Sequence, residues 1–320
     1  MSTPALRNAS ALVAALLQAA VLAFGQSVPP PLFSCPSPPR PPNFEYVGLD
    51  RGGNLVIRYP ANLDNPRAKN PGQTVTMHVV LPNHVGPRIR MQVASTGGDF
   101  MYNYAISNQP TARQPITWWK MIMPIPAPIL AAHGPGWTAL KDVNPAPTDP
   151  NVPAYFPPPA YFLDWVAGNQ LSPHGGAIEP GQARPGFTIV TPASPGFTRS
   201  YFQADGPNDP THDMPNDAAQ EVEYYMAIRH YAKEFRFLGP AFLPGTPPAE
   251  IARSLLKSTQ WLACHGQLDQ NSAFVRSAVD DLRGIARGTG PEALAAPPST
   301  PMEIQLATAL DLNDLARPRP

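Results

Sequence analysis

Hydrophobic and polar residues alternate in several short runs over the first two thirds of the chain. In a β-strand, successive side chains point to opposite faces, so a strand with one buried face shows this alternation. Phe100, Tyr102 and Tyr104, for example, fall on a single face. Glycine, proline and asparagine, which turns favour, separate the runs. Strands are predicted over residues 54–59, 74–81, 89–94, 100–107, 116–123, 186–191 and 198–204.

The pattern changes to a helical period near the carboxyl end, where apolar residues recur every three or four positions. A first predicted helix begins after Pro247 and ends near Gly266, and a second covers 271–287. Proline at the first helical position and glycine after the last one are usual helix boundaries. Residues 300–315 predict a third helix, and residues 218–231 fit either a helix or a strand.

Residues 124–185 show little regular pattern and many prolines, so we expect a long irregular segment there, either a binding loop or a cap. The other elements predict a mainly β fold: an antiparallel β-sandwich over 43–245 with a small C-terminal helical appendix at 246–315. A proline-rich linker at 28–42 precedes the predicted sandwich, and we expect a disordered tail at 316–320.

Residues 1–27 have the features of a secretory signal peptide. One basic residue, Arg7, precedes an apolar stretch at 11–25, and the small residues Ala23 and Gly25 provide a site for a leader peptidase. The apolar stretch is shorter than the roughly 20 residues that a membrane-spanning helix needs, so a cleaved leader fits better than an anchor. We therefore expect an exported protein, periplasmic or extracellular, whose mature form has no transmembrane segment.

Composition separates this chain from several classes of protein. Proline accounts for 45 of the 320 residues, but aromatic and β-branched residues lie between the prolines, which favours an ordered protein with short strands. The 23 basic residues balance the 23 acidic residues. A neutral chain lacks the electrostatic signature of proteins that bind nucleic acids or membrane surfaces, so we expect neither as a partner.

Two cysteines, Cys35 and Cys264, follow the predicted leader. In an oxidising compartment two thiols can pair, and a bridge between these two would connect the N-terminal arm to the helical region. The alternative is one exposed and one buried free thiol. The sequence leaves both alternatives open.

A succession of short motifs follows Trp165: I-x-P-G at 178–181, G-F at 186–187 and P-G at 195–196. Gly136-Trp137 and Tyr102-Asn103-Tyr104 precede it in the chain. This set resembles a group of uncharacterised exported bacterial β-sandwich proteins. The resemblance implies secretion and a β-sandwich, and it carries no catalytic residues over to this chain.

The helical tail over 256–282 is similar to the small FIMAH domain of secreted bacterial proteins. The matching positions are Trp261-Leu262, Gly266, Ser272 and Leu282, whereas the downstream part of that domain's pattern is replaced by Pro297-Pro298. This resemblance implies a helical C-terminal region and nothing about activity.

Four aspartates form the best candidate for a metal site: Asp205, Asp209, Asp213 and Asp217. Carboxylate and amide oxygens are the ligands that calcium prefers, and secreted domains use calcium to fix loops. Their spacing differs from that of an EF-hand. A solvated turn uses the same residue types, and we favour that alternative. We expect no cofactor other than calcium at this loop.

Large aromatic residues gather between positions 118 and 165. The candidate ligand-binding residues among them are Trp118, Trp119, Trp137, Tyr161 and Trp165. Aromatic rings exposed on a β-sandwich stack against sugar rings in many extracellular modules. Core packing is the alternative for most of them, and we favour it because large apolar groups prefer burial.

No motif of a known catalytic site occurs in the sequence. It contains no G-x-S-x-G elbow and no phosphate-binding glycine loop, and its seven histidines lack the spacing of zinc ligands. We therefore interpret the chain as a non-enzymatic binding or structural module, with an extracellular polysaccharide or an envelope component as the expected partner. The alternatives are a carbohydrate-binding module that uses exposed aromatic residues, and a secreted hydrolase whose carboxylates meet only in the fold.

Overall fold

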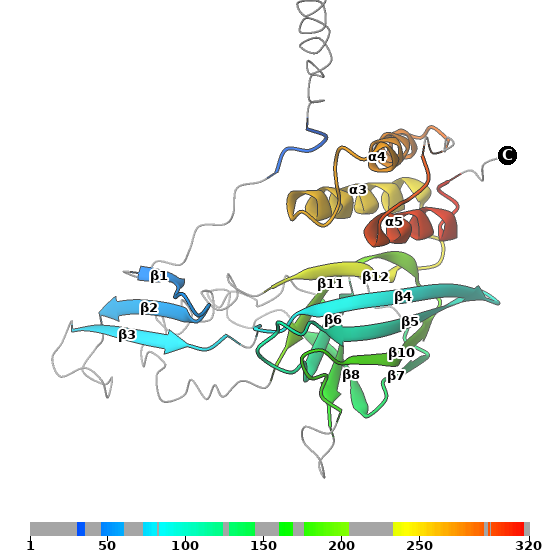
Figure 1. The fold of residues 1–320 in the computed structure, drawn as a ribbon. Helices are drawn as coiled ribbons and strands as arrows, with labels where there is room; N and C mark the ends of the chain where they lie inside the picture. The colour runs from blue at the N-terminus through cyan, green and yellow to red at the C-terminus, as the bar shows by residue number, and fades with distance from the viewer. Residues whose placement is uncertain are drawn as a thin grey trace, which may run out of the picture.

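The structure, a computed structural model, is mainly β and antiparallel (Figure 1). It describes residues 31–35, 46–60, 73–81, 83–123, 128–144, 160–168, 176–204, 233–290, 294 and 296–316. In this part of the chain the strands form three sheets, and three helices follow them.

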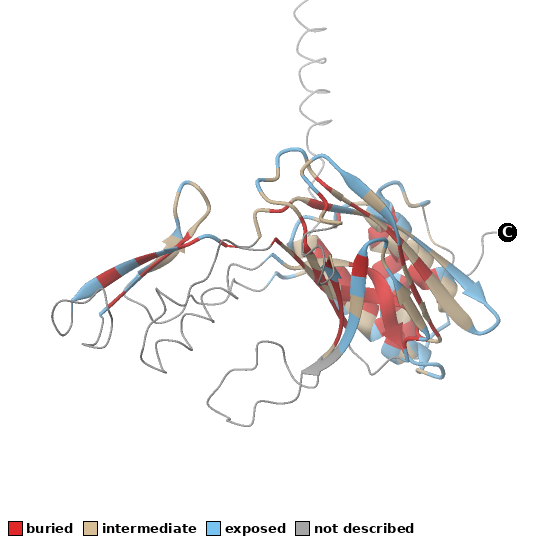
Figure 2. Ribbon diagram, turned by 90° about the horizontal axis from the view of Figure 1, so that it is seen from below, coloured by how far each residue is buried: buried red, intermediate tan, exposed pale blue. Residues whose placement is uncertain are grey.

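Two of the sheets face each other and form the predicted β-sandwich. The four-stranded sheet contains, in spatial order, β4 (Pro87–Thr96), β5 (Asp99–Asn108), β10 (Ala183–Thr191) and β7 (Ala131–His133). The five-stranded sheet contains, in spatial order, β12 (Phe235–Phe242), β11 (Ser194–Gln203), β6 (Trp118–Met123), β9 (Ala160–Ala167) and β8 (Trp137–Asn144). Buried residues line the strands where the two sheets face each other, whereas much of their outer surface is exposed (Figure 2).

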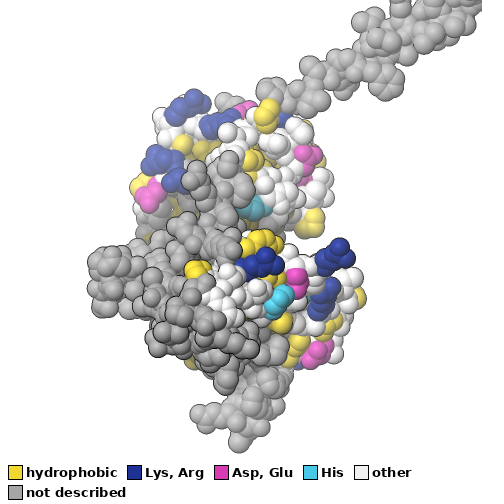
Figure 3. All heavy atoms as spheres, turned by 90° about the vertical axis from the view of Figure 1, so that its left-hand side faces the viewer, with side chains coloured by type: hydrophobic (Ala, Val, Ile, Leu, Met, Phe, Trp, Pro, Cys, Tyr) yellow, Lys and Arg dark blue, Asp and Glu magenta, His cyan; other side chains and the backbone are white. Residues whose placement is uncertain are grey.

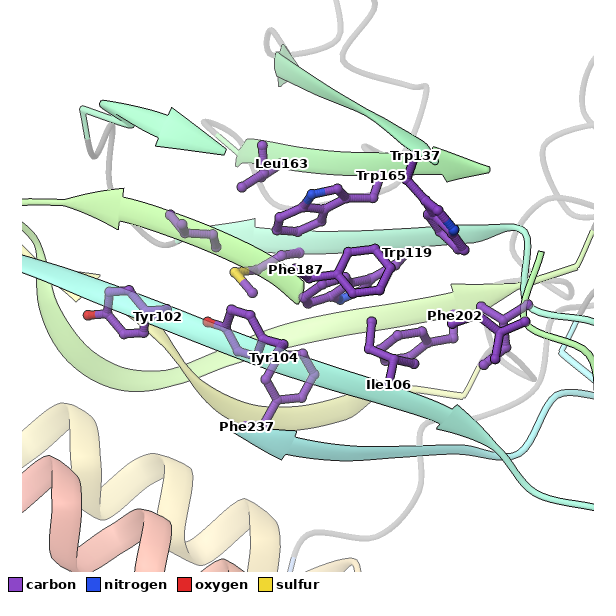
Figure 4. Packing of buried hydrophobic residues seen from close by; sticks show 14 of the residues in the cluster. Tyr102, Tyr104, Ile106, Trp119, Trp137, Leu163, Trp165, Phe187, Phe202 and Phe237 are labelled. Atoms are coloured by element: carbon purple, nitrogen blue, oxygen red, sulfur yellow. The ribbon is translucent and has the colours of Figure 1, made fainter. Parts of the chain in front are cut away.

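Aromatic rings fill the core between the two sheets (Figure 4). Trp119 of β6 is fully buried and stacks on Trp165 of β9, with 4.0 Å between the ring centres. A second stacked ring, Phe202, lies 5.6 Å from Trp119. Tyr104 and Phe187 of the opposite sheet contact the same tryptophan edge-on at 5.2 and 5.5 Å. Such ring pairs add to the stabilisation from burial, so Trp119 is the centre of the contact between the sheets.

Two tyrosines of β5 also donate hydrogen bonds outside their own sheet, one to the β10–β11 connection and one to β12. Tyr102 donates its hydroxyl to the carbonyl of Ala193 at 2.8 Å, and Tyr104 donates to the carbonyl of Leu238 at 3.0 Å. A buried hydroxyl without a partner would cost free energy. These bonds explain how phenol groups are accommodated in an apolar core.

The first three strands form a separate antiparallel sheet beside the sandwich (Figure 1). They are β1 (Tyr46–Leu49), β2 (Leu55–Pro60) and β3 (Thr74–Val79). This sheet has its own hydrophobic cluster, which includes Leu55, Ile57, Tyr59, Val75, Met77 and Val79. The region predicted as a sandwich, 43–245, therefore also contains this smaller sheet.

The three predicted C-terminal helices are confirmed as α3 (Pro248–Cys264), α4 (Ala273–Ala286) and α5 (Pro301–Leu312). Pro248 occupies the start of α3, and Gly266 after its end has the positive φ of 68° that glycine tolerates best. The helices pack against β11 and β12, which contribute Phe197, Leu238, Ala241 and Phe242 to the shared hydrophobic cluster. None of the described helices is long and apolar enough to cross a membrane.

A disulfide joins Cys35 to Cys264, with 5.4 Å between the Cα atoms. The pairing that the sequence left open is therefore formed in the structure. The short segment 31–35 lies on the helices, where Gln260 donates to the carbonyl of Ser34 at 2.8 Å and Arg283 donates to that of Leu32 at 3.3 Å. The N-terminal arm is thus attached to the helical region by a covalent bond and by polar contacts.

The expectation of an irregular segment over 124–185 was wrong. This region contributes β7, β8 and β9, and β9 is an interior strand of the five-stranded sheet. The sequence analysis also missed β12, which contains Gly239 and Pro240. By contrast, the seven predicted strands correspond to β2, β3, β4, β5, β6, β10 and β11. The ambiguous segment 218–231, the predicted leader and residues 317–320 lie outside the described residues.

A capping box begins α5. Thr300 accepts a hydrogen bond from the backbone N–H of Glu303 at 3.2 Å, and Glu303 accepts from that of Thr300 at 3.0 Å. The buried Glu303 carboxylate also accepts from Ser299 and from the hydroxyl of Ser272, which connects α5 to α4. Burial raises the pKa of this carboxyl, but the hydrogen bonds outweigh it and lower the pKa to about 2.

Glu303→Gln is expected to remove a pH dependence of stability. Because the pKa of Glu303 is lowered on folding, from 4.5 to about 2, its carboxylate contributes stability above pH 4.5. That contribution is lost as the pH falls from 4.5 toward 2. Thermal melts of both proteins across this window should converge as the pH falls. A difference in melting temperature between the two proteins that stays constant across this pH range would contradict this role.

Candidate functional site

A pocket of about 450 Å³ lies where the three-stranded sheet meets the sandwich. We call it the junction pocket. The β1–β2 turn forms one wall, and the segments before β4 and after β5 form the other, with Lys233 beside them. Its volume is within the usual range for small-molecule sites, about 300–1,000 Å³.

The β1–β2 turn is held by the carboxylate of Asp50. This carboxylate accepts from the backbone N–H groups of Gly52 at 2.7 Å and Asn54 at 2.9 Å, and from the Asn54 amide at 3.0 Å. The side-chain bond from Asn54 is the main reason that the pKa of Asp50 is lowered. Aspartate stabilises turns in this way because its side chain bonds the backbone two residues on. The wall of the pocket is therefore fixed locally.

On the other wall, the side chain of Asn108 connects three segments. Its oxygen accepts from the backbone N–H of Gly86 at 2.9 Å, and its amide donates to the carbonyls of Gln114 at 2.8 Å and Ile178 at 3.1 Å. Asn108 is buried at 1% exposure, so these bonds satisfy an amide that would otherwise be costly in the interior. They hold the two segments of this wall together.

Two hydrogen bonds join the walls. Arg113 donates from Nη1 to the carbonyl of Gly52 at 2.8 Å, and the ring nitrogen Nε2 of His84 lies 3.1 Å from the carbonyl of Gly53. Because a carbonyl only accepts, Nε2 of His84 carries the proton in this contact. The small sheet and the sandwich are therefore connected through polar contacts at the pocket itself.

The charged side chains of the junction pocket are basic. Arg113 and Lys233 are exposed and line it, whereas the described lining residues include no carboxylate. Asp50 belongs to the adjoining turn, and its oxygens already accept bonds from that turn. Figure 3 views the molecule from the side of the three-stranded sheet, where charged and histidine side chains lie beside hydrophobic ones.

The candidate aromatic residues do not gather on a surface. Trp119 and Trp165 are fully buried, and Trp137 is 7% exposed. All three pack in the core of the sandwich (Figure 4), and Trp137 donates its indole N–H to the carbonyl of Gly176 at 2.6 Å. A buried ring presents no face to a sugar, so the structure places these three in core packing, the alternative that the sequence analysis favoured.

Trp118 and Tyr161 are the two remaining candidates, and both are half-buried. Tyr161 packs against the sandwich core. Trp118 lies on the outer face of the five-stranded sheet, where the ammonium of Lys120 lies 4.9 Å from its ring centre. The same ammonium pairs with Asp164 at 3.2 Å. A ring that already contacts a cation has less free surface for a ligand.

A network of charged side chains covers the outer face of β11 and β12. The carboxylate of Glu234 accepts from Arg199 at 2.9 Å, from Tyr201 at 3.0 Å and from Arg236 at 2.8 Å. The guanidinium of Arg236 also lies 4.3 Å from the ring centre of Trp261 in α3. This last contact connects α3 to the sheet.

The protonation states of this network fit a structural role. Burial raises the pKa of Glu234, but Arg199 and Arg236 outweigh it and lower the pKa below its ordinary value. Burial, followed by the charge of Glu234, raises the pKa of Tyr201 to about 12. The carboxylate is therefore ionised and the phenol neutral at neutral pH, the states in which Glu234 accepts the hydrogen bonds of its three partners.

The structure brings no metal site together within the part of the chain that it describes. No group of three or more histidine, cysteine or acidic side chains gathers there. The calcium candidates, Asp205 to Asp217, lie outside the described residues. The pair His78 and Asp50 is separated by 4.0 Å, beyond hydrogen-bonding distance, and the side chain of His78 is 63% exposed.

The sequence analysis missed the residues of the junction pocket. They come from segments near positions 50, 84, 111 and 233, which meet only in the folded chain. The one local signal is the succession Asp50, Gly52, Gly53 and Asn54, which is typical of a tight turn. That signal predicts the turn but not what faces it.

Comparison of this chain with models of known protein families, with curated proteins and with solved structures finds no match.

Proposed function

We propose that this protein is an exported, non-enzymatic binding module whose ligand occupies the junction pocket. The observation that carries the proposal is the pocket itself, which is of small-molecule size and is formed jointly by the sandwich and the smaller sheet. The proposed partner is an extracellular polysaccharide or another component of the envelope.

Two features support an extracytoplasmic location. Residues 1–27 have the composition of a signal peptide. The Cys35–Cys264 disulfide is typical of proteins in oxidising compartments.

The side chains of the pocket favour a ligand-binding role over a catalytic role. Nη1 of Arg113 donates to the carbonyl of Gly52, and Nε2–H of His84 is used in the contact with Gly53. Lys233 stands at the rim as an exposed cation. Such groups hold and orient an anionic or hydroxyl-bearing ligand, whereas general acid–base catalysis needs a group aimed at a reacting atom.

The pocket is a better candidate for the binding site than the aromatic residues. Trp119, Trp137 and Trp165 support the core, and the ring of Trp118 contacts Lys120. A sugar-stacking platform needs free ring faces.

Thr111→Trp is expected to abolish ligand binding. Thr111 is an exposed residue of the pocket wall, so an indole at this position fills the cavity without disturbing the core. The test is binding of the purified protein to an array of extracellular and envelope glycans. We expect retention of at least one glycan by the parent protein and its loss in the variant. Mass spectrometry of the retained glycan should show it uncleaved.

Thr96→Trp is the matched control, because Thr96 is exposed at the end of β4 and does not line the pocket. This variant should bind as the parent protein does. Equal binding by Thr111→Trp would contradict the proposed site, and so would failure of the parent protein to bind any component. A cleaved glycan would contradict the non-enzymatic assignment.

A further inference from the structure

We infer that the ligand of the junction pocket is an acidic sugar, a hexose unit bearing a carboxylate. This inference rests on the proposed function and adds the chemical class of the ligand. It follows from the charge of the pocket, from its neutral polar groups and from the way its walls are fixed.

Charge selects an anion. Arg113 and Lys233 lie at the same pocket, and neither forms an ion pair with a described residue. Arg113 uses one donor on the Gly52 carbonyl, which leaves other N–H groups of the planar guanidinium for a ligand. Guanidinium groups match the geometry of a carboxylate, and an ammonium adds a second positive charge.

The uncharged part of the lining suits a sugar ring. Gln109 and Thr111 offer an amide and a hydroxyl, which pair with ligand hydroxyl groups. Leu49, exposed at 47%, supplies apolar surface for the C–H face of a pyranose. A site for an acidic peptide would instead need a groove with backbone partners along an extended chain. The mixture of amide, hydroxyl and apolar groups around two cations favours the sugar.

The pocket is fixed before the ligand arrives. The Asp50 bonds hold one wall, the Asn108 bonds hold the other, and Arg113 and His84 join the two. A site that is already ordered loses less entropy on binding, so a few polar contacts suffice for measurable affinity.

The test compares two matched probes, galacturonate trisaccharide and its fully methyl-esterified form, by titration calorimetry. The ester keeps every hydroxyl but removes the negative charges. We expect the acid to bind at least about tenfold more tightly than the ester, and added salt to weaken binding of the acid. Lys233→Gln and Arg113→Gln should each weaken binding of the acid by about tenfold more than they weaken binding of the ester.

Arg90→Gln is the matched control, because Arg90 is an exposed arginine on β4 that does not line the pocket. Thermal melts identify any variant that is misfolded, and Lys233→Gln remains informative if Arg113→Gln loses the bond to Gly52 and unfolds. Equal binding of acid and ester, both lost in Thr111→Trp, would overturn the acidic-sugar inference and leave the proposed function standing. Binding of a triglutamate peptide but of neither sugar would overturn it in favour of a peptide ligand. If no probe or glycan binds the parent protein, the proposed function fails as well.

Discussion

Trp119→Ala is expected to lower the free energy of unfolding by about 3–5 kcal/mol, the usual cost of removing a large aromatic side chain from a core. Trp119 is fully buried, and its ring contacts aromatic rings from both sheets of the sandwich. The substitution removes those contacts and leaves a cavity that the surrounding sheets fill only in part. Urea denaturation followed by circular dichroism measures the change.

Trp118→Ala is the control for this prediction, since Trp118 is the neighbouring tryptophan and lies half-buried on the outer face of the same strand. We expect a smaller loss of stability for this variant, because its side chain has less surface to lose to water. Equal losses for the two variants would show that the sandwich core is not centred on Trp119.

Replacing both Cys35 and Cys264 by serine is expected to produce the second large effect. The disulfide closes a loop with a sequence separation of 229 residues. Chain-entropy arguments assign about 5 kcal/mol to a loop of this length, as an upper value, because the cross-link restricts the unfolded chain. The double variant should therefore unfold at much lower urea concentration than the parent protein. Replacing both cysteines avoids the new free thiol that a single variant would have.

Treatment of the parent protein with a reductant provides an independent comparison. It should lower the urea concentration at the unfolding midpoint as the double substitution does. An unchanged unfolding midpoint in both experiments would contradict the expected contribution of the disulfide. The intact mass of protein recovered outside the cytoplasm tests the compartment as well. We expect a mass without residues 1–27, and one that rises on reduction and alkylation by two modified thiols.

Alternation along the chain made β5 predictable from the sequence, whereas β9 lacks that signal. Tyr102 and Tyr104 alternate with half-buried residues along β5, and this alternation predicted the strand. In β9, Leu163, Asp164 and Trp165 are all buried, so no alternation exists to be detected. The proline-rich surroundings of β9 then favoured an irregular segment.

Proline is also the reason that β12 was not predicted. Pro240 lies within this strand, and proline in a sequence argues against a central strand because it has no N–H to donate. The structure places β12 at the edge of its sheet, where α5 covers it and Gln305 accepts from the N–H of Leu238 at 3.0 Å. Sheet order depends on contacts between distant segments, so the sequence alone did not reveal that this strand is an edge.

The helices were predictable because their signals are local. Apolar spacing, an N-terminal proline and a C-terminal glycine all occur within a single helix. The candidate site, by contrast, is formed by residues that are distant in the sequence. Arg113 and Lys233 are far apart in the chain, and neither has a neighbour that indicates binding. The fold of the sandwich brings them to one pocket, and the β1–β2 turn of the small sheet completes its lining.

The Cys35–Cys264 bond also determines how the chain carries mechanical load. A pull between a point before residue 35 and a point after residue 264 passes directly through the two sulfur atoms. Both β regions lie inside the resulting covalent ring and are bypassed. The segment inside the ring would be roughly 750–820 Å long if fully extended, given a separation of 229 residues at about 3.3–3.6 Å each. The disulfide prevents a pull on the ends from extending this segment. Tension applied to the ends of an oxidised molecule would therefore pass through α4 and α5 and bypass α3 and the junction pocket.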